Sequence, residues 1–263
     1  MKIVEKSIIG KATDQSLCED GLFISDDFIA VVDGVTAKSP ELFSGKTGGR
    51  AAMEKILTTL KTTEKDINKD DLFKLLNKSV GELYKISLKG RASACAIIYS
   101  KAHNEIWCCG DCQCIINDKL FLNEKEIDFV TSKVRALVLE IALLKGKTEA
   151  ELLENDIGRE FIKQLIDNQY LFENSNNQFA YEVLNGKALR YDLIKTYKVN
   201  SGDTVVLASD GYPVLKSTLE ESENELKKVL KENPLCNKGY LSTKGVSKGN
   251  LSFDDRTYIK FIV

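Results

Sequence analysis

The sequence predicts an α+β fold with stacked antiparallel sheets, and the order of its apolar patterns is the main reason. A short β-branched run comes first, two amphipathic helices follow, and short strand-like runs precede a second helical region and a last set of strands. This segregation differs from the regular alternation of strand and helix that is typical of a doubly wound parallel sheet. The 263 residues are 43% hydrophobic, so we expect one large domain over residues 1–263.

The first predicted elements are a strand and two helices. Residues 28–32 form an apolar run that ends at Asp33-Gly34, which predicts a buried strand followed by a turn. A helix is expected to begin near Lys46, because apolar residues recur at helical spacing over residues 53–60. Asp70-Asp71 favours the start of another helix, since carboxylates are stabilised at the positive end of a helix.

The middle of the chain changes to short β-rich runs. Residues 94–122 predict an antiparallel meander, with Asn117-Asp118 as the hairpin turn between its last two strands. The remaining predictions are a helical region over residues 124–171, strands near 179–184 and 193–199, a buried strand at 204–208, a charged helix at 219–230, a loop at 234–250 and a closing strand at 257–263.

Composition excludes several classes of protein. Lysine and arginine number 37 against 39 acidic residues, without a basic stretch that contains aromatic residues, so we expect no nucleic-acid partner. The sequence lacks a signal-peptide pattern and a run of about 18 apolar residues, which predicts a cytoplasmic protein without a membrane span. The seven cysteines are odd in number and several lie in apolar runs, so we expect reduced, buried thiols.

Five acidic sites attract attention because of their position beside predicted strands. Three of them follow apolar runs directly, and the other two lie next to strand-like segments. Carboxylates at strand ends are costly to bury unpaired, but several that converge become favourable around hard divalent cations. The five sites are Glu19-Asp20, Asp33-Gly34, Gly110-Asp111, Asp210-Gly211 and Asp254-Asp255.

A single Asp-Gly pair after a strand is more often a turn than a ligand. The set is more informative than any one pair, because Mg²⁺ and Mn²⁺ prefer several oxygen ligands in octahedral geometry. Two such ions a few ångströms apart lower the pKa of a bridging water and stabilise the transition state of an in-line displacement. The sequence therefore predicts metal-dependent hydrolysis.

The order of the acidic motifs resembles that of the type-2C, metal-dependent protein phosphatase family (PPM-type). The resemblance covers residues 18–257, nearly the whole chain. The motifs that carry it are Cys18-Glu19-Asp20-Gly21, Val31-Val32-Asp33-Gly34-Val35, Cys109-Gly110-Asp111-Cys112, Leu207-Ala208-Ser209-Asp210-Gly211-Tyr212 and Asp254-Asp255-Arg256-Thr257.

The resemblance implies a four-layer αββα sandwich and a protein serine/threonine phosphatase that holds two Mn²⁺ or Mg²⁺ ions. A metal-activated hydroxide would attack phosphorus without a covalent enzyme intermediate. Asp33 and Asp210 are then the catalytic carboxylates, and Asp33 would bridge both ions. The implied metal-binding residues are Glu19, Asp20, Asp33, Gly34, Asp111, Asp210 and Asp254.

Within this set the resemblance implies distinct roles. Gly34 would offer its carbonyl. Asp210 and Asp254 would bind one ion, whereas Glu19 would reach the other through water, with Asp20 beside it. Asp111 would hold a weaker third ion. The implied partner is a phosphoprotein with phosphoserine or phosphothreonine, and we expect the chain to be a monomer.

Two positions depart from the family. Gln15 occupies the place of an arginine that binds phosphate in many members, and Val35 the place of a histidine that often acts as a general acid. Lys11 and Lys46 are candidate phosphate-binding residues. Lys46 also lies in Ser44-Gly45-Lys46-Thr47, but Pro40 stands where a nucleotide-binding loop requires glycine.

Other constellations favour structural roles. Cys108 and Cys109 are adjacent strand residues and point to opposite faces, which favours core packing of the cysteine cluster over a zinc site. The single histidine, His103, lies in a polar turn. The alternative from another class is a catalytically silent pseudophosphatase that acts as a binding or regulatory module, favoured by Gln15 and Val35 and opposed by retention of the principal carboxylates.

Overall fold

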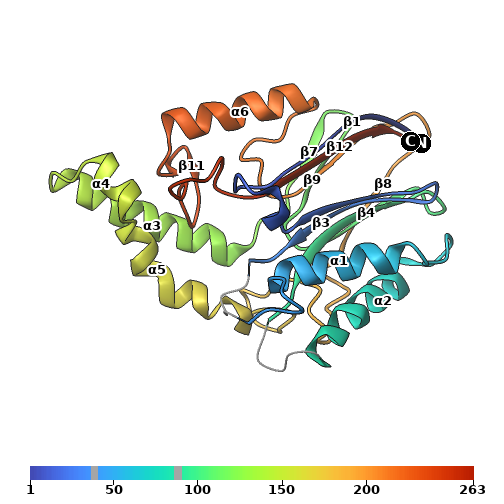
Figure 1. Cartoon of the computed structure of the whole chain (residues 1–263). Helices are drawn as coiled ribbons and strands as arrows, with labels where there is room; N and C mark the ends of the chain where they lie inside the picture. Colours follow the sequence, from blue (N-terminus) through green and yellow to red (C-terminus); the bar gives the residue numbers. More distant parts are fainter. Residues whose placement is uncertain (37–40, 86–90) are drawn as a thin grey trace.

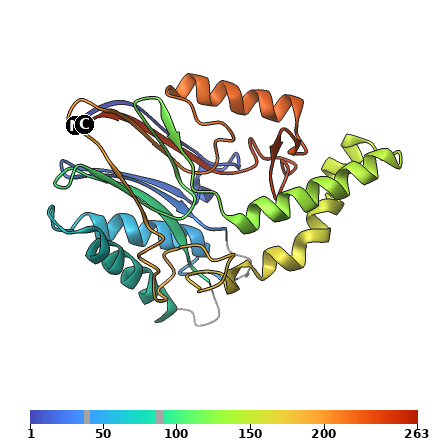
Figure 2. The ribbon, with the colours of Figure 1, turned by 180° about the vertical axis from the view of Figure 1, so that it is seen from behind.

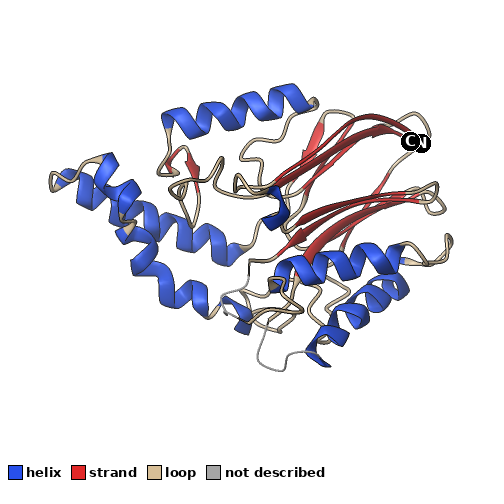
Figure 3. Ribbon diagram, in the orientation of Figure 1, coloured by secondary structure: helices blue, strands red, loops and turns tan. Residues whose placement is uncertain are grey.

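The protein contains two five-stranded antiparallel sheets stacked face to face (Figures 1 and 3), in a computed structural model that describes residues 1–36, 41–85 and 91–263. The first sheet has the order β2 (Asp20–Ile24), β3 (Phe28–Gly34), β4 (Ala94–Ser100), β5 (Glu105–Cys109) and β8 (Lys195–Lys198). The second has the order β1 (Lys2–Ile9), β12 (Arg256–Ile262), β9 (Thr204–Ala208), β6 (Gln113–Ile116) and β7 (Lys119–Phe121).

The two sheets bury an apolar core between them. Ile29 and Val31 of β3 point into this core and meet Leu207 and Ile259 from the second sheet. The alternate β3 residues, Ala30 among them, point to the other face and pack in a second core under the helices. A strand buried on both faces accounts for the continuous apolar run that predicted it.

Helices cover both outer faces of the sandwich. The first sheet is covered by α1 (Gly48–Leu60) and α2 (Lys69–Gly81), and α6 (Leu219–Glu232) lies over the second (Figure 1). α1 begins where Thr47 Oγ1 accepts a hydrogen bond of 3.3 Å from the N–H of Arg50. The predicted four-layer αββα arrangement is confirmed.

A helical arm extends from one end of the sandwich (Figure 2) and consists of α3 (Glu126–Leu144), α4 (Glu149–Glu154) and α5 (Ile157–Asp167). Arg135 of α3 is fully buried and its Nη2 lies 2.7 Å from Asp156 Oδ2, which joins α3 to the start of α5. These elements confirm the predicted helical region. Three short 3₁₀ helices complete the helical elements of the described residues: Gln15–Leu17, Glu82–Lys85 and Gln169–Leu171.

The predicted meander over residues 94–122 is wrong. β4 and β5 belong to the first sheet, but β6 and β7 pair in the second, so the chain crosses between the sheets at residues 110–112. Short strands with the same alternation can pair in either sheet, which is why the pattern did not reveal the crossing. The turn at Asn117-Asp118 is confirmed, with φ values of 47° and 66°.

Two further differences concern strands. Residues 179–184 form no strand and have only isolated bridges, such as Ala94 with Leu184. β1, which was not predicted, alternates exposed and half-buried residues and pairs with β12, so that the two chain ends lie side by side. The predicted loop over 234–250 contains a small hairpin of β10 (Asn237–Lys238) and β11 (Tyr240–Leu241).

Other sequence expectations concern buried thiols, membranes and Pro40. All seven cysteines are free and buried, as predicted. In the part of the chain that the structure describes, no helix is long and apolar enough to cross a membrane. Pro40 lies outside the described residues.

Candidate metal centre

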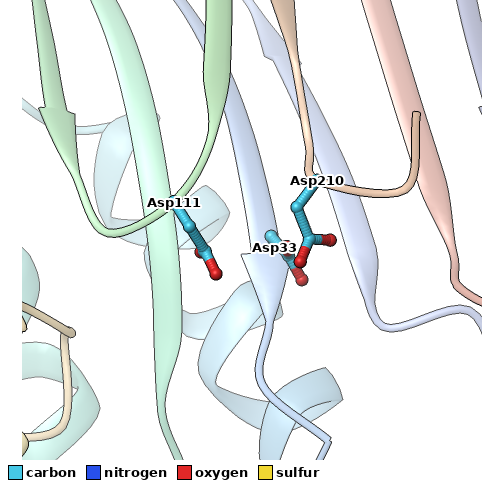
Figure 4. Close-up of side chains that lie close together, drawn as sticks. All are labelled: Asp33, Asp111 and Asp210. Atoms are coloured by element: carbon cyan, nitrogen blue, oxygen red, sulfur yellow. The ribbon is translucent and has the colours of Figure 1, made fainter. Parts of the chain in front are cut away.

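Three aspartates converge at one end of the sandwich, where strands of both sheets terminate. The carboxylate oxygens of Asp33, Asp111 and Asp210 offer a group of atoms that all lie within 4.8 Å of one another (Figure 4). Asp33 is near the end of β3, Asp111 lies in the crossing between β5 and β6, and Asp210 follows β9. Segments far apart in the sequence therefore deliver one acidic cluster, which we call the aspartate cluster.

Glycines next to the cluster allow the backbones of its loops to approach closely. A Cβ added to Gly211 would lie 2.0 Å from the carbonyl oxygen of Asp255. A Cβ added to Gly34 would lie 2.5 Å from the carbonyl oxygen of Gly49. Both distances are shorter than carbon and oxygen tolerate, so the Asp-Gly pairs are required by packing as well as by turn formation.

The aspartate cluster is electrostatically unbalanced. Burial, followed by the charges of neighbouring carboxylates including Asp111, raises the pKa values of Asp33 and Asp210 well above the ordinary range. Burial also acts to raise the pKa of Asp111, but Lys125 Nζ, 2.5 Å from Asp111 Oδ2, outweighs it, and the pKa is lowered. Three carboxylates thus share one contacting ammonium group among the described residues.

The donor set fits a hard divalent cation. Asp111 Oδ1 is buried and has no hydrogen-bond partner, although Lys125 contacts the other oxygen of the same carboxylate. A buried oxygen without a donor favours a ligand at this position. Carboxylate oxygens are the preferred ligands of Mg²⁺ and Mn²⁺. Asp33, Asp111 and Asp210 are therefore the residues that would hold such an ion.

Glu19 lies outside the aspartate cluster. Its Oε1 accepts a hydrogen bond of 2.6 Å from Thr47 Oγ1, and its Oε2 accepts one of 2.7 Å from Thr36 Oγ1. Its backbone carbonyl accepts a hydrogen bond of 3.1 Å from the N–H of Gly34. Both carboxylate oxygens of Glu19 therefore already have protein donors.

Asp254 is engaged by two lysines. Lys11 Nζ donates a hydrogen bond of 3.1 Å to Asp254 Oδ1, and Lys244 Nζ contacts Asp254 Oδ2. Burial acts to raise the pKa of Asp254, but Lys244 and then Lys11 outweigh it and hold the pKa well below its usual range. Asp20, also implied as a metal-site residue, is buried and accepts a hydrogen bond of 2.6 Å from Ser209 Oγ.

The residues at the two departures from the family have structural contacts. Gln15 Oε1 accepts a hydrogen bond of 2.7 Å from the N–H of Gly10, and its Nε2 donates one of 2.7 Å to the carbonyl of Ala12. Gln15 thereby closes the loop that carries Lys11. Val35 packs at the edge of the core between the sheets.

The two candidate phosphate-binding lysines lie in different environments. Lys11 Nζ is close to Glu19, Asp254 and Asp255, at 3.7, 3.1 and 3.4 Å. Burial acts to lower the pKa of Lys11, but these three carboxylates outweigh it and raise the pKa above its ordinary value. Lys46 is exposed and pairs with Glu54.

The aspartate cluster lines a cavity of about 570 Å³ that also reaches the helical arm and the hairpin of β10 and β11. Four basic residues line it: Lys125, Lys133, Arg159 and Lys244. We predicted none of the four as a site residue, because they lie at the start of α3, within α3, on α5 and in the loop near the hairpin. The sequence held no signal that separated these four from its other lysines and arginines.

No protein-family model matches the chain, and no curated protein matches its sequence. Solved structures do match. The serine/threonine phosphatase PstP/Ppp of Mycobacterium tuberculosis has a TM-score of 0.52 and 14% identity, over 98% of this chain and 97% of that chain. The catalytic domain of PstP in complex with two manganese ions has a TM-score of 0.52 and 14% identity, over 99% and 98%.

The serine/threonine phosphatase Stp1 from Staphylococcus aureus is similar in the same way, with a TM-score of 0.52 and 14% identity over 100% of this chain and 95% of that chain. These likenesses extend over nearly the full length of each chain. The protein has the fold of the 2C-type, metal-dependent serine/threonine phosphatases. The resemblance carried by the five acidic motifs is thereby confirmed at the level of the fold.

Proposed function

We propose that this chain is a metal-dependent phosphoester hydrolase that removes phosphate from phosphoserine or phosphothreonine in proteins. The observation that carries the proposal is the aspartate cluster in a cavity whose wall contains four basic side chains. Asp33 and Asp210 are the catalytic carboxylates of this proposal, together with Asp111. A negatively charged phosphate group would interact both with a cation held by the carboxylates and with the basic side chains around it.

The cation is Mn²⁺ or Mg²⁺ in this proposal. When bound, it activates water and stabilises negative charge that develops on the phosphoryl oxygens. The chain's own residues orient the substrate: Arg159 Nη1 is fixed by a hydrogen bond of 2.8 Å to the carbonyl of Thr243, and Lys133 is exposed at the wall of the cavity. Both side chains can donate hydrogen bonds to the oxygens of a phosphate group or of an acidic side chain of the substrate.

The protein substrate rests on the comparisons, because PstP and Stp1 are described as serine/threonine phosphatases. A cytoplasmic location, a monomeric state and a single domain over residues 1–263 are parts of the proposal that rest on the sequence. The resemblance implies a second ion that Glu19 would reach through water, and Lys11 Nζ lies 3.7 Å from Glu19 Oε2.

The direct test is hydrolysis of p-nitrophenyl phosphate and of a phosphothreonine peptide with Mn²⁺, with Mg²⁺ and with a chelator. We expect turnover that requires the metal and that falls by at least about 100-fold in Asp33→Ala and in Asp210→Ala. Asp26→Ala is the matched control, because Asp26 is exposed in the hairpin between β2 and β3. Its rate should equal that of the wild type.

The two substrates separate phosphoprotein specificity from general phosphoester hydrolysis. Faster metal-dependent hydrolysis of the peptide supports the protein substrate, whereas hydrolysis of the small ester alone contradicts it. Binding of Mn²⁺ without turnover of either substrate contradicts hydrolysis and identifies the catalytically silent binding module.

A further inference from the structure

Lys11 reaches two residues, Glu19 and Asp254, that the resemblance to the fold family implies as metal-binding residues. Its Nζ lies within 3.7 Å of four oxygens from three separate segments of the chain. The four are Thr36 Oγ1 at 3.1 Å, Asp254 Oδ1 at 3.1 Å, Asp255 Oδ2 at 3.4 Å and Glu19 Oε2 at 3.7 Å. An ammonium group surrounded by oxygen acceptors satisfies the same electrostatic demand as a metal ion.

We propose that the Lys11 ammonium replaces the second divalent ion, so that the protein binds one exchangeable ion, at Asp33, Asp111 and Asp210. This inference deepens the proposed function, on which it rests. The chain then combines one fixed organic cation and one exchangeable metal ion where PstP has been solved with two manganese ions.

The backbone around Lys11 is built to hold this position. The N–H of Lys11 donates a hydrogen bond of 2.7 Å to Asp255 Oδ1, while the N–H of Glu19 donates one of 3.0 Å to Asp255 Oδ2. The carbonyl of Lys11 accepts a hydrogen bond of 2.7 Å from the N–H of Leu251. Gln15 closes the same loop from within. Lys11 is thus anchored at its backbone and at its ammonium group.

The charges around Lys11 agree with this assignment. Asp255 is buried and places an additional carboxylate beside Glu19 and Asp254. An additional positive charge is needed to compensate it, and Lys11 Nζ lies 3.4 Å from Asp255 Oδ2.

The distribution of charge separates the two halves of the site. Glu19, Asp254 and Asp255 are three carboxylates contacted by two ammonium groups, those of Lys11 and Lys244. The aspartate cluster has three carboxylates and one contacting ammonium group, that of Lys125. Its deficit of two positive charges matches one divalent ion, and one of its buried carboxylate oxygens, Asp111 Oδ1, has no hydrogen-bond partner.

The test is a titration of the metal-free chain with Mn²⁺ alone, in which calorimetry and native mass spectrometry measure the number of ions bound. We expect one ion per wild-type chain. Lys11→Met removes the charge and keeps most of the aliphatic stem, so it should bind a second ion with an affinity within about tenfold of the first. Lys46→Met is the matched control, because Lys46 also pairs with a carboxylate, Glu54, but is exposed; it should still bind one.

The outcomes distinguish the replacement of an ion by Lys11 from the proposed phosphatase function. Two ions on the wild type, or one ion on a folded Lys11→Met, would overturn the replacement by lysine and leave the phosphatase proposal standing. No ion on the wild type would overturn both. If Lys11→Met does not fold, Lys11→Arg, which keeps the charge, must still bind one ion. The number of ions bound by the wild-type chain tests the replacement by lysine without any variant.

Discussion

Ser209 Oγ donates a hydrogen bond of 2.6 Å to Asp20 Oδ2, and this contact joins the two sheets beside the aspartate cluster. Ser209 follows β9 of the second sheet, and Asp20 begins β2 of the first. The same hydroxyl accepts a hydrogen bond of 2.9 Å from the N–H of Thr257. All three residues are buried, so the hydroxyl fixes the distance between the sheet ends from which Asp33 and Asp210 project.

Removal of this hydroxyl should destabilise the fold. Ser209→Ala leaves the carboxyl of Asp20 and the N–H of Thr257 buried with one partner fewer, at a cost of about 1 to 3 kcal/mol. Urea unfolding of the metal-free protein measures the loss. Ser217→Ala is the control, because Ser217 Oγ donates to Asp118 at an exposed site. Equal stability of the two variants would contradict a structural role for the Ser209 contact.

Gly211 provides a steric test of the same region. The methyl group of Gly211→Ala would meet the Asp255 carbonyl oxygen at 2.0 Å, so the turn after Asp210 must move. We expect a loss on the order of 3 kcal/mol in the free energy of unfolding and weaker binding of Mn²⁺. Gly249→Ala controls for strain, since Gly249 has a φ of +87° and open space around it, and should cost about 1 kcal/mol. A Gly211→Ala variant as stable as this control would show that the turn is not constrained.

Removal of the Lys125 charge should destabilise the metal-free protein and make its stability depend more strongly on the metal ion. In Lys125→Met the buried carboxylate of Asp111 loses the ammonium group at 2.5 Å, which should cost about 3 to 5 kcal/mol in the presence of a chelator. Addition of Mn²⁺ should then raise the melting temperature by more than it does in the wild type. Lys147→Met, in an exposed turn after α3, is the matched control. Equal shifts with Mn²⁺ in all three proteins would contradict this compensation.

A pH dependence is expected from Glu182, which lies outside the aspartate cluster. Burial, only partly opposed by Arg190, raises the pKa of Glu182 from 4.5 to about 7. The folded protein therefore binds more protons than the unfolded chain between these values, and this group lowers stability as pH rises from 4.5 through about 7. Glu182→Gln should gain stability relative to the wild type across this window.

Urea unfolding at about pH 5 and about pH 8 checks this sign, because the advantage of Glu182→Gln should be larger at the higher pH. Glu64→Gln, on the exposed turn between α1 and α2, measures the effect of removing one surface charge. An advantage that is the same at both pH values would contradict the raised pKa of Glu182.

Much of the fold was predictable because its strands and helices have distinct periodicities. The apolar run before Asp33 and the one before Asp210 became β3 and β9, and the acidic pair at Asp70-Asp71 lies in the first turn of α2. The pairing of strands was less accessible. β5 and β6 are separated by only a few residues but enter different sheets, and periodicity identifies the faces of a strand without identifying its neighbour.

The site was predictable in its carboxylates and not in its cations. The sequence motifs pointed to Asp33, Asp111 and Asp210, which the structure brings together, whereas Glu19 and Asp254 have hydrogen bonds to threonines and lysines. Lysines are frequent in this sequence and mostly solvated, so nothing distinguished Lys125 from the others. Its pairing with Asp111 depends on where α3 begins relative to the sheet crossing, which is a property of the tertiary structure.

The most direct test of the central claim is a crystal structure of the full chain with Mn²⁺, in which anomalous scattering identifies the ion. The account predicts a manganese peak about 2.1 Å from carboxylate oxygens of Asp33, Asp111 and Asp210. No peak among these three aspartates at saturating Mn²⁺ would contradict it.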